Sequence, residues 1–275
     1  MKEEVIVFSC GNILKMLSAI ITSLRYQPII FIHYCMSFLL GTRERTVNLI
    51  SSTDLADHLK NGKSLIRIGD GEAMLIMGRS IHYQKFHPEI RSILKKIISE
   101  YRTYSPYILA IPVFAITESA ADLKTRGRLR IWRLFRSLFK MMFDATQDYA
   151  DAVIFYHRDN FSKTVTPLLQ AKHVVIVSKP ENNTPELNQY MNNHSQSWEY
   201  ISVPAADAYH DYLSICKQID SIIAAKPGTE KLLVFAAGPA SKVLSLHYIE
   251  RKIQCIDIGH GLEILGHSND YTNRL

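Results

Sequence analysis

The sequence of 275 residues has little cysteine and tryptophan, and it lacks the familiar paired-cysteine and phosphate-loop motifs. Its four cysteines are scattered, and no two of them have the CxxC spacing of a zinc site or a redox pair. We expect them to be reduced, buried thiols, which agrees with a cytoplasmic location. The chain also carries no Walker loop and no GxGxxG fingerprint, so neither signature marks a nucleotide site.

The composition excludes disorder and gives no sign of nucleic-acid binding. Hydrophobic residues make up 47% of the chain and charged residues 21%, as in ordinary globular proteins. The net charge of +6 favours anionic partners, among them nucleotides and an anionic membrane surface. Because no nucleic-acid-binding motif accompanies this charge, we do not expect nucleic acid as a partner.

The N-terminus is apolar, yet it lacks a convincing membrane span. Apolar runs cover residues 5–24 and 28–40, but polar residues interrupt the first, and the second falls short of the roughly 20 residues that a spanning helix needs. We treat residues 1–48 as a helical N-terminal segment and residues 49–275 as the main domain. The segment is expected either to pack on that domain or to lie as a peripheral contact on the inner face of the membrane.

Short apolar strands alternate with helices along the main domain. This alternation predicts an α/β fold, a Rossmann-like and mostly parallel sheet flanked by helices. We expect strands over residues 64–68, 107–113, 152–156, 173–177, 200–203, 231–236 and 254–258, and helices over residues 52–59, 88–101, 124–143 and 242–251. The stretch 180–193, which contains several asparagines and two prolines, predicts a surface loop or a broken helix.

The helix expected over residues 124–143 is amphipathic and basic. Its predicted polar face carries Arg130, Arg133, Arg136 and Lys140. Such a face either lies on an anionic membrane or acidic partner, or is the solvated side of a helix packed on the core.

A tight acidic turn follows the first strand of the main domain. Asp70 and Glu72 alternate with Gly69 and Gly71 directly after the strand. Open α/β sheets bind their ligands at the carboxyl ends of their strands, which is where this turn lies. Carboxylates two positions apart suit Mg or Mn shared with substrate phosphates. The alternative is a solvated turn, in which Gly and Asp are common for conformational reasons alone.

A second strand-turn-helix unit lies near the end of the chain. Gly238 and Pro239 form a turn that enters a helix, and free amides at a helix N-terminus attract anions. The turn could equally be only a connection. The last strand ends in Asp257 and His260, of which His260 is able to act as a base, a phosphate donor or a metal ligand, although a single histidine is more often structural.

Three stretches together resemble the GT-D type glycosyltransferases. Residues 67–72, 237–244 and 256–260 are similar, in this order, to the RFGDGE and GPxAxxL…DIGH patterns of that family. The resemblance covers residues 53–265. Ile68 replaces the family's Phe conservatively. The family continues past its His with further acidic residues, whereas residues 261–264 read Gly-Leu-Glu-Ile here, so Glu263 is not taken as their equivalent.

This resemblance implies metal-dependent transfer of a sugar from a nucleotide-diphosphate sugar, commonly a UDP-sugar, in surface polysaccharide or glycoconjugate synthesis. The acceptor would be a glycan, a lipid-linked molecule or a glycoprotein. Asp70 and Glu72 would lie near the Mn or Mg ion and the diphosphate, and His260 or Asp257 would act as the base. The remaining donor-binding candidates are Arg67, Gly69, Gly71, Gly238, Pro239, Ser241, Lys242 and Arg158.

Two rival functions remain open at this stage. The chain could be another metal-dependent enzyme acting on phosphate esters with the same carboxylates. It could also be a non-catalytic nucleotide-sugar-binding or scaffold subunit of a polysaccharide assembly complex.

Overall fold

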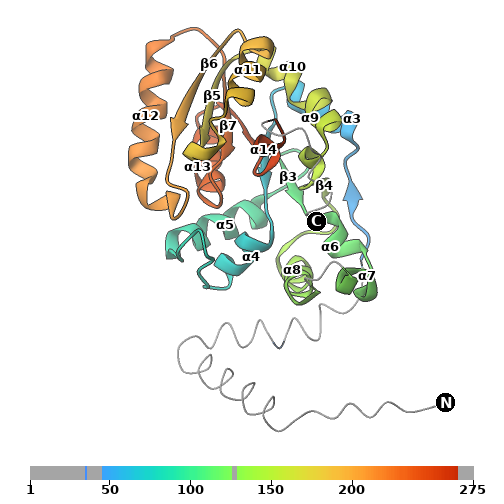
Figure 1. Ribbon diagram of the computed structural model, residues 1–275. Helices are drawn as coiled ribbons and strands as arrows, with labels where there is room; N and C mark the ends of the chain where they lie inside the picture. The colour runs from blue at the N-terminus through green and yellow to red at the C-terminus, as the bar shows by residue number, and fades with distance from the viewer. Residues whose placement is uncertain (1–34, 36–44, 126–128, 266–275) are drawn as a thin grey trace, which may run out of the picture.

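The computed structural model describes residue 35, residues 45–125 and residues 129–265. One sheet of eight strands forms the centre of the molecule, in the order β1-β4-β3-β2-β8-β7-β5-β6 (Figure 1). Every pair of neighbouring strands is parallel. The strands are β1 (Asn48–Leu49), β2 (Ser64–Arg67), β3 (Tyr107–Ile111), β4 (Asp148–Asp151), β5 (His173–Ser178), β6 (Ser197–Ser202), β7 (Lys231–Ala236) and β8 (Gln254–Asp257). The predicted α/β fold with a parallel sheet is confirmed.

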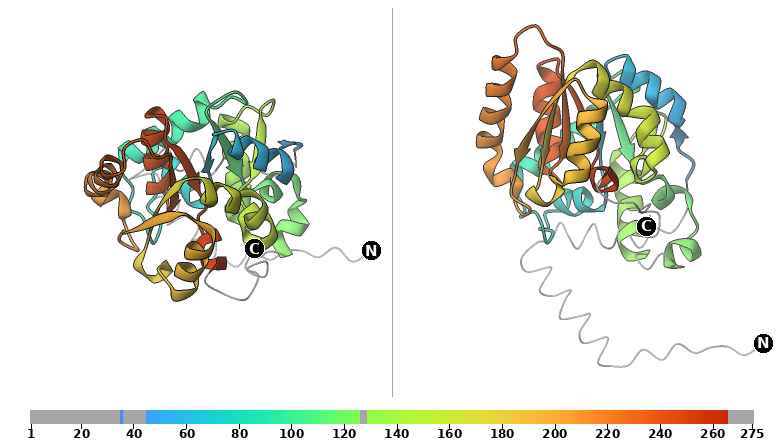
Figure 2. Two further views of the ribbon diagram at one scale, coloured as in Figure 1. Left: turned by 90° about the horizontal axis from the view of Figure 1, so that it is seen from above. Right: turned by 45° about the horizontal axis from the view of Figure 1, so that its top comes forward.

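Helices cover both faces of this sheet (Figures 1 and 2). On one face lie α4 (Asp70–Ile76), α5 (Pro88–Glu100), α6 (Val113–Thr117), α7 (Ala120–Thr125), α8 (Leu129–Met142), α12 (Tyr212–Ala225) and α13 (Ala240–Glu250). On the other lie α3 (Ser52–Lys60), α9 (Arg158–Thr164), α10 (Thr166–Ala171), α11 (Pro185–His194) and α14 (Gly261–Leu265). Short 3-10 turns are η1 (Ile154–Tyr156), η2 (Pro180–Asn182) and η3 (Ala208–Asp211).

The two-residue period of the strands divides the core into two layers. In β5, Val175 and Val177 join the cluster on the α13 side, while Val174 and Ile176 join the cluster on the α11 side. All six residues of β5 are buried. Strands covered on both faces read as continuous apolar runs, which is why β5 and β7 are visible in the sequence.

The strand predicted over residues 152–156 is wrong. β4 ends at Asp151, and the Val153 amide then donates to Asp151 Oδ1 at 3.2 Å, which turns the chain out of the sheet. Ile154 and Phe155 are buried, but in the 3-10 turn η1. Their apolar character therefore reflects packing against the core.

Most of the stretch 180–193, predicted as a loop or broken helix, belongs to the ten-residue helix α11, which ends at His194. Thr184 caps it, since its side-chain oxygen accepts from the Leu187 amide at 3.2 Å, and Pro185 occupies the first turn. Leu187 and Met191 bury the inner face of the helix.

The basic helix α8 is a core helix. Trp132, Phe135 and Phe139 are buried as the amphipathic pattern predicts. Arg136 is also fully buried, donating from Nε to the Ala115 carbonyl at 2.8 Å and from Nη2 to the Glu118 carbonyl at 2.6 Å, so its predicted place on a polar face is wrong. Of the four basic residues, Arg130 alone is exposed, and Arg133 and Lys140 are half-buried. This packing gives no support to a membrane-binding role for the helix.

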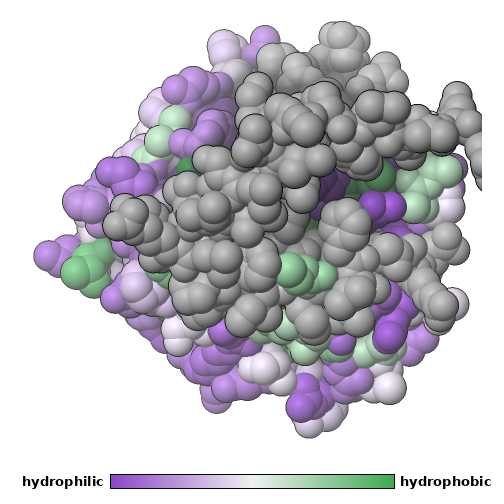
Figure 3. Space-filling view, turned by 90° about the horizontal axis from the view of Figure 1, so that it is seen from below, coloured by the Kyte–Doolittle hydropathy of each residue, from purple (hydrophilic) through white to green (hydrophobic). Residues whose placement is uncertain are grey.

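The predicted N-terminal segment, residues 1–48, lies almost entirely outside the described residues. Within residues 45–125 and 129–265, and at residue 35, there is no helix long and apolar enough to cross a membrane. Of the described cysteines, Cys216 and Cys255 are buried as expected, whereas Cys35 is exposed. Figure 3 shows that the described surface on the lower face is mainly hydrophilic, with small scattered hydrophobic patches.

Candidate functional site

A cavity of about 630 Å³ opens at the carboxyl edge of the sheet. Its walls come from the segments that follow five strands: Asp70 and Gly71 after β2, Lys179 and Asn182 after β5, Val203 to Ala205 after β6, Ala237 and Gly238 after β7, and Gly259, His260 and Glu263 after β8. β2 and β8 are neighbours in the sheet although they come from opposite ends of the described chain. A reversal of strand order of this kind creates the crevice in which open α/β sheets bind ligands.

Glu72 lies behind this cavity wall, in the first turn of α4. Its Oε2 accepts from the Gly69 amide at 2.8 Å, which closes a capping interaction, and its Oε1 lies 2.9 Å from Lys242 Nζ. The residue is 6% exposed. Both carboxylate oxygens thus have partners from the protein.

Lys242 lies at the centre of a buried charge cluster. Its Nζ is 2.9 Å from Glu72 Oε1 and 3.0 Å from Asp257 Oδ2, and it also donates to the Gly238 carbonyl at 3.2 Å. The two carboxylates belong to the segments around β2 and β8, and the carbonyl belongs to the turn after β7. The ammonium therefore ties together three strand ends that form the cavity wall.

The ion pairs determine the charge states in this cluster. Burial opposes ionisation of Glu72 and Lys242, but the attraction between opposite charges outweighs it. As a result, the pKa of Glu72 lies below its ordinary value and the pKa of Lys242 lies above it, Asp257 and Glu72 together raising the latter. Glu72 and Lys242 are therefore an ion pair near neutral pH.

Asp257 and Arg67 complete the support of the β8 turn. Asp257 is fully buried and accepts from the amides of Arg67 at 3.4 Å and Gly259 at 3.3 Å. The Arg67 guanidinium lies 5.6 Å from the Tyr156 ring centre and directly beneath Gly259, where any Cβ would overlap Nη1. Burial opposes its charge, but Tyr156 and Asp257 hold the pKa of Arg67 above its ordinary value.

The two predicted glycine turns meet at a single side chain, Tyr83. A Cβ on Gly71 would lie 2.7 Å from Tyr83 Oη, and a Cβ on Gly238 would lie 3.3 Å from Tyr83 Cε2. Gly238 also has a positive φ of 57°. Position 238 favours glycine because of this positive φ, and at Gly71 a Cβ would displace the Tyr83 hydroxyl.

A histidine, a carboxylate and a lysine form a second polar group in the cavity lining. His260 Nδ1 lies 3.2 Å from Glu263 Oε1, and Lys179 Nζ lies 3.4 Å from the same oxygen. The hydrogen bond with His260, together with Lys179, lowers the pKa of Glu263 to about 2 despite partial burial. The imidazole is 68% exposed, so it is accessible to a ligand.

The structure brings four of the predicted site residues to the cavity: Asp70, Gly71, Gly238 and His260. A second group lies behind its wall: Arg67, Gly69, Glu72, Pro239, Ser241, Lys242 and Asp257. Ser241, for example, is fully buried and its hydroxyl accepts from the Ala237 amide at 2.9 Å. Arg158 is exposed at the start of α9 and does not line the cavity.

Three of the predicted site residues contact one another or the backbone instead of lining the cavity. Glu72 contacts Lys242 and the Gly69 amide, and Lys242 contacts two carboxylates. Asp257 is fully buried and does not line the cavity. Their roles toward a metal ion, a diphosphate and an acceptor hydroxyl stay predictions.

The sequence analysis did not single out Lys179 or Tyr83, and it assigned no role to Glu263. Lys179 follows β5 directly, and the strand-end rule that found Asp70 applies equally to it. Glu263 lies three residues beyond His260, a spacing at which the two side chains meet. Tyr83 comes from the loop between α4 and α5, which carries no local signal.

The cavity offers only part of a metal-ligand set from the protein. In the described part of the chain, no group of three or more His, Cys, Asp or Glu side chains is arranged to hold a metal ion. Asp70 is the carboxylate of the motif that reaches the cavity. One carboxylate together with substrate phosphates is a usual ligand set for Mg²⁺.

Comparisons with known proteins agree with the site. The family model described as "Glycosyltransferase GT-D fold" matches residues 65–264. The probable glycosyl transferase Gly of Streptococcus gordonii is 23% identical over an alignment of 226 residues that covers 79% of this chain and 32% of that protein. The chain thus spans about a third of the length of this curated relative.

Two solved structures share the fold. A glycosyltransferase from Streptococcus sanguinis superposes with a TM-score of 0.66 at 23% identity, covering 83% of this chain and 92% of that one. A domain described as having a distinct glycosyltransferase fold gives a TM-score of 0.68 at 19% identity, covering 88% of each chain. Because the family match runs through β2, the Gly238 turn and the β8 turn, which build the cavity, the chain belongs to the GT-D family of glycosyltransferases.

Proposed function

We propose that the chain transfers a sugar from a UDP-sugar to a hydroxyl acceptor in a metal-dependent reaction. The observation that carries this proposal is the cavity at the carboxyl edge, where Asp70, the Gly238 turn and His260 face one space of about 630 Å³. That volume lies within the range of small-molecule and cofactor sites. The family to which the chain belongs supplies the reaction class.

The donor diphosphate is assigned to the wall formed by the Gly238 turn. This turn leads into the eleven-residue helix α13, whose N-terminal dipole favours negative charge. Lys179 is the cavity-lining cation and, unlike Lys242, is 37% exposed. Positive charge here would stabilise the charge that develops on the leaving diphosphate.

Asp70 is the proposed ligand of a Mn or Mg ion, with the remaining ligands supplied by diphosphate oxygens and water. When bound, the ion would supply electrostatic stabilisation of the leaving group. Glu72 contributes indirectly, since it closes the α4 cap and, through Lys242, fixes the turn that carries Asp70.

His260 is the proposed base. In a direct displacement, the acceptor oxygen forms a bond to the anomeric carbon while the bond from that carbon to the diphosphate oxygen breaks. The diphosphate leaves with the electron pair, and the acceptor proton passes to His260 Nε2. Glu263 at Nδ1 then stabilises the imidazolium.

The acceptor is proposed to be a glycan, a lipid-linked molecule or a protein, and the place of action the cytoplasm. Lipid-linked acceptors would fit an apolar N-terminal segment at the inner face of the membrane. The polypeptide described here contributes no spanning helix to such a contact.

The test is calorimetry with a panel of nucleotide sugars, with and without Mn, followed by detection of released nucleotide. Wild type, Asp70→Asn and Asp159→Asn are compared, Asp159 being an exposed carboxylate on α9 outside the cavity. A transferase loses orders of magnitude in rate in Asp70→Asn and keeps its rate in Asp159→Asn. A scaffold binds nucleotide sugars without metal-dependent turnover, and a phosphate-ester enzyme turns over substrates that carry no sugar.

A further inference from the structure

The loop between α4 and α5 forms one wall of the cavity. Ser80, Ile81, His82 and Tyr83 from this loop all line it. The loop closes on itself, with the Ile81 amide donating to the Gln84 carbonyl at 2.9 Å. It is fastened to the segment after β6, which lines the cavity next to it through Val203, Pro204, Ala205 and Ala208.

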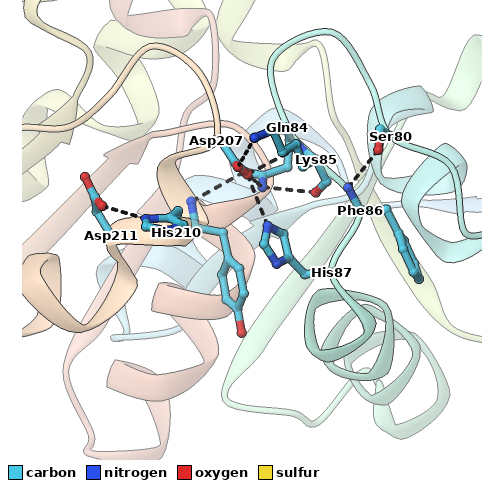
Figure 4. A network of polar contacts seen from close by, with 9 residues as sticks. Ser80, Gln84, Lys85, Phe86, His87, Asp207, His210 and Asp211 are labelled. Atoms are coloured by element: carbon cyan, nitrogen blue, oxygen red, sulfur yellow. Dashed lines mark hydrogen bonds and ion pairs between the residues drawn. The ribbon is translucent and has the colours of Figure 1, made fainter.

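Asp207 makes this attachment (Figure 4). Its amide donates to the Tyr83 carbonyl at 2.8 Å. Its Oδ1 accepts from the Gln84 side chain and from the Lys85 amide at 3.3 Å, and lies 3.2 Å from His87 Nε2. Asp207 thus contacts four of the five loop residues from 83 to 87, more than 100 residues away in the sequence.

The backbone at Asp207 is unusual, which indicates that its position is imposed. Its φ is 56°, in the left-handed region that aspartate tolerates better than most residues. Gln84 is 1% exposed and accepts in turn from the Tyr209 amide at 3.4 Å. Strained backbone persists where surrounding contacts fix it, and it concentrates at functional sites.

The loop held by Asp207 places Tyr83 beside the Gly238 turn, to which the donor diphosphate is assigned. Tyr83 lies against Gly71 and Gly238, the two turns that flank the proposed diphosphate site. A diphosphate bound at the Gly238 turn therefore meets the phenol ring or its hydroxyl. Asp207 itself does not line the cavity, so any effect on the ligand passes through the loop.

We propose that Tyr83 contacts the donor diphosphate and that Asp207 is the positioning residue that holds it there. This inference rests on the proposed function and adds two residues to the donor site that lie outside its sequence motifs. It assigns the Asp207 contacts to ligand binding, beyond any contribution to stability.

The test is a double-mutant cycle with UDP as the probe. Binding of UDP in the presence of Mn is measured by calorimetry for wild type, Tyr83→Ala, Asp207→Ala and the double variant. Each single variant is expected to weaken binding about tenfold, which corresponds to 1.4 kcal/mol. Because Asp207 acts through Tyr83, the double variant is expected to bind like Tyr83→Ala alone.

The matched control is Asp211→Asn, a nearby carboxylate that pairs with exposed His210 and does not line the cavity. It should bind UDP like wild type. Asp207→Asn serves as a second variant because asparagine also tolerates left-handed backbone. With donor turnover as a further readout, KM for the donor should rise more in Asp207→Asn than kcat falls.

Two results overturn the inference. One is wild-type affinity for UDP in a folded Asp207→Ala protein, and the other is a double variant whose loss is the product of the single losses. Failure of the proposed function gives a different result, because wild type itself then binds neither UDP nor any nucleotide sugar.

Discussion

Removal of the Lys242 ammonium should destabilise the protein strongly, and the loss should grow with pH. In Lys242→Met the apolar stem is kept, but Glu72 and Asp257 are left as buried carboxylates without their cation. Breaking a buried ion pair on one side costs about 3–5 kcal/mol. We expect the lower end, about 3 kcal/mol, because the Gly69 amide still serves Glu72 and two amides still serve Asp257.

The pH dependence follows from the direction of each pKa shift. In wild type, the lowered pKa of Glu72 gives stability that is present above its unfolded value of 4.5 and lost as pH falls. The raised pKa of Lys242 gives stability that is present below 10.5 and lost as pH rises. The contribution is therefore constant between these values. In Lys242→Met, burial is no longer offset by the ammonium and raises the pKa of Glu72, so the deficit at pH 8 should exceed that at pH 5.

Urea unfolding followed by circular dichroism measures this deficit. Lys96→Met is the control, since its ammonium forms an exposed pair with Glu250 at 3.0 Å and should matter little. Adding Glu72→Gln to Lys242→Met should recover part of the loss. If the deficit equals that of the control, or does not depend on pH, the buried ion pairs of Lys242 do not stabilise the fold as we expect.

Two further variants test the β8 turn. Gly259→Ala places a Cβ onto Arg67 Nη1 at a residue whose φ is 48°. We expect the unfolding free energy, measured by urea titration, to fall by about 1–3 kcal/mol. Wild-type stability would contradict the packing of Arg67 beneath this turn. Glu263→Gln removes a carboxylate whose pKa is about 2, and hence its charge near neutral pH. Its kcat should fall about tenfold or more while donor affinity is kept, and an unchanged kcat in steady-state assays would exclude Glu263 as a partner of the base.

The fold was largely predictable because its signals are local. β5 and β7 are buried on both faces and therefore read as apolar runs bounded by polar residues. Ile154 and Phe155 misled the strand assignment, because burial in a 3-10 turn and burial in a strand produce the same apolar pattern. The side chain of Arg136 was misplaced because its partners, the Ala115 and Glu118 carbonyls, come from a neighbouring helical segment.

The turns that build the site could be predicted from the sequence, but the directions of their side chains could not. The strand-turn-helix pattern located Asp70 and Gly238, since both lie at strand ends. It did not separate Asp70, which faces the cavity, from Glu72, which faces Lys242, because two acidic residues in one turn look alike in sequence. The contribution of Tyr83 depends on Asp207, more than 100 residues away, and no local pattern reports such a contact.

Calorimetric titration of the wild-type chain with UDP-sugars, with and without Mn and repeated on Asp70→Asn, decides whether the cavity binds a glycosyl donor. We expect Mn-dependent binding of a UDP-sugar, slow release of UDP, and loss of both in Asp70→Asn. If no nucleotide sugar binds under either condition, the cavity at the carboxyl edge is not a donor site and the proposed reaction is wrong.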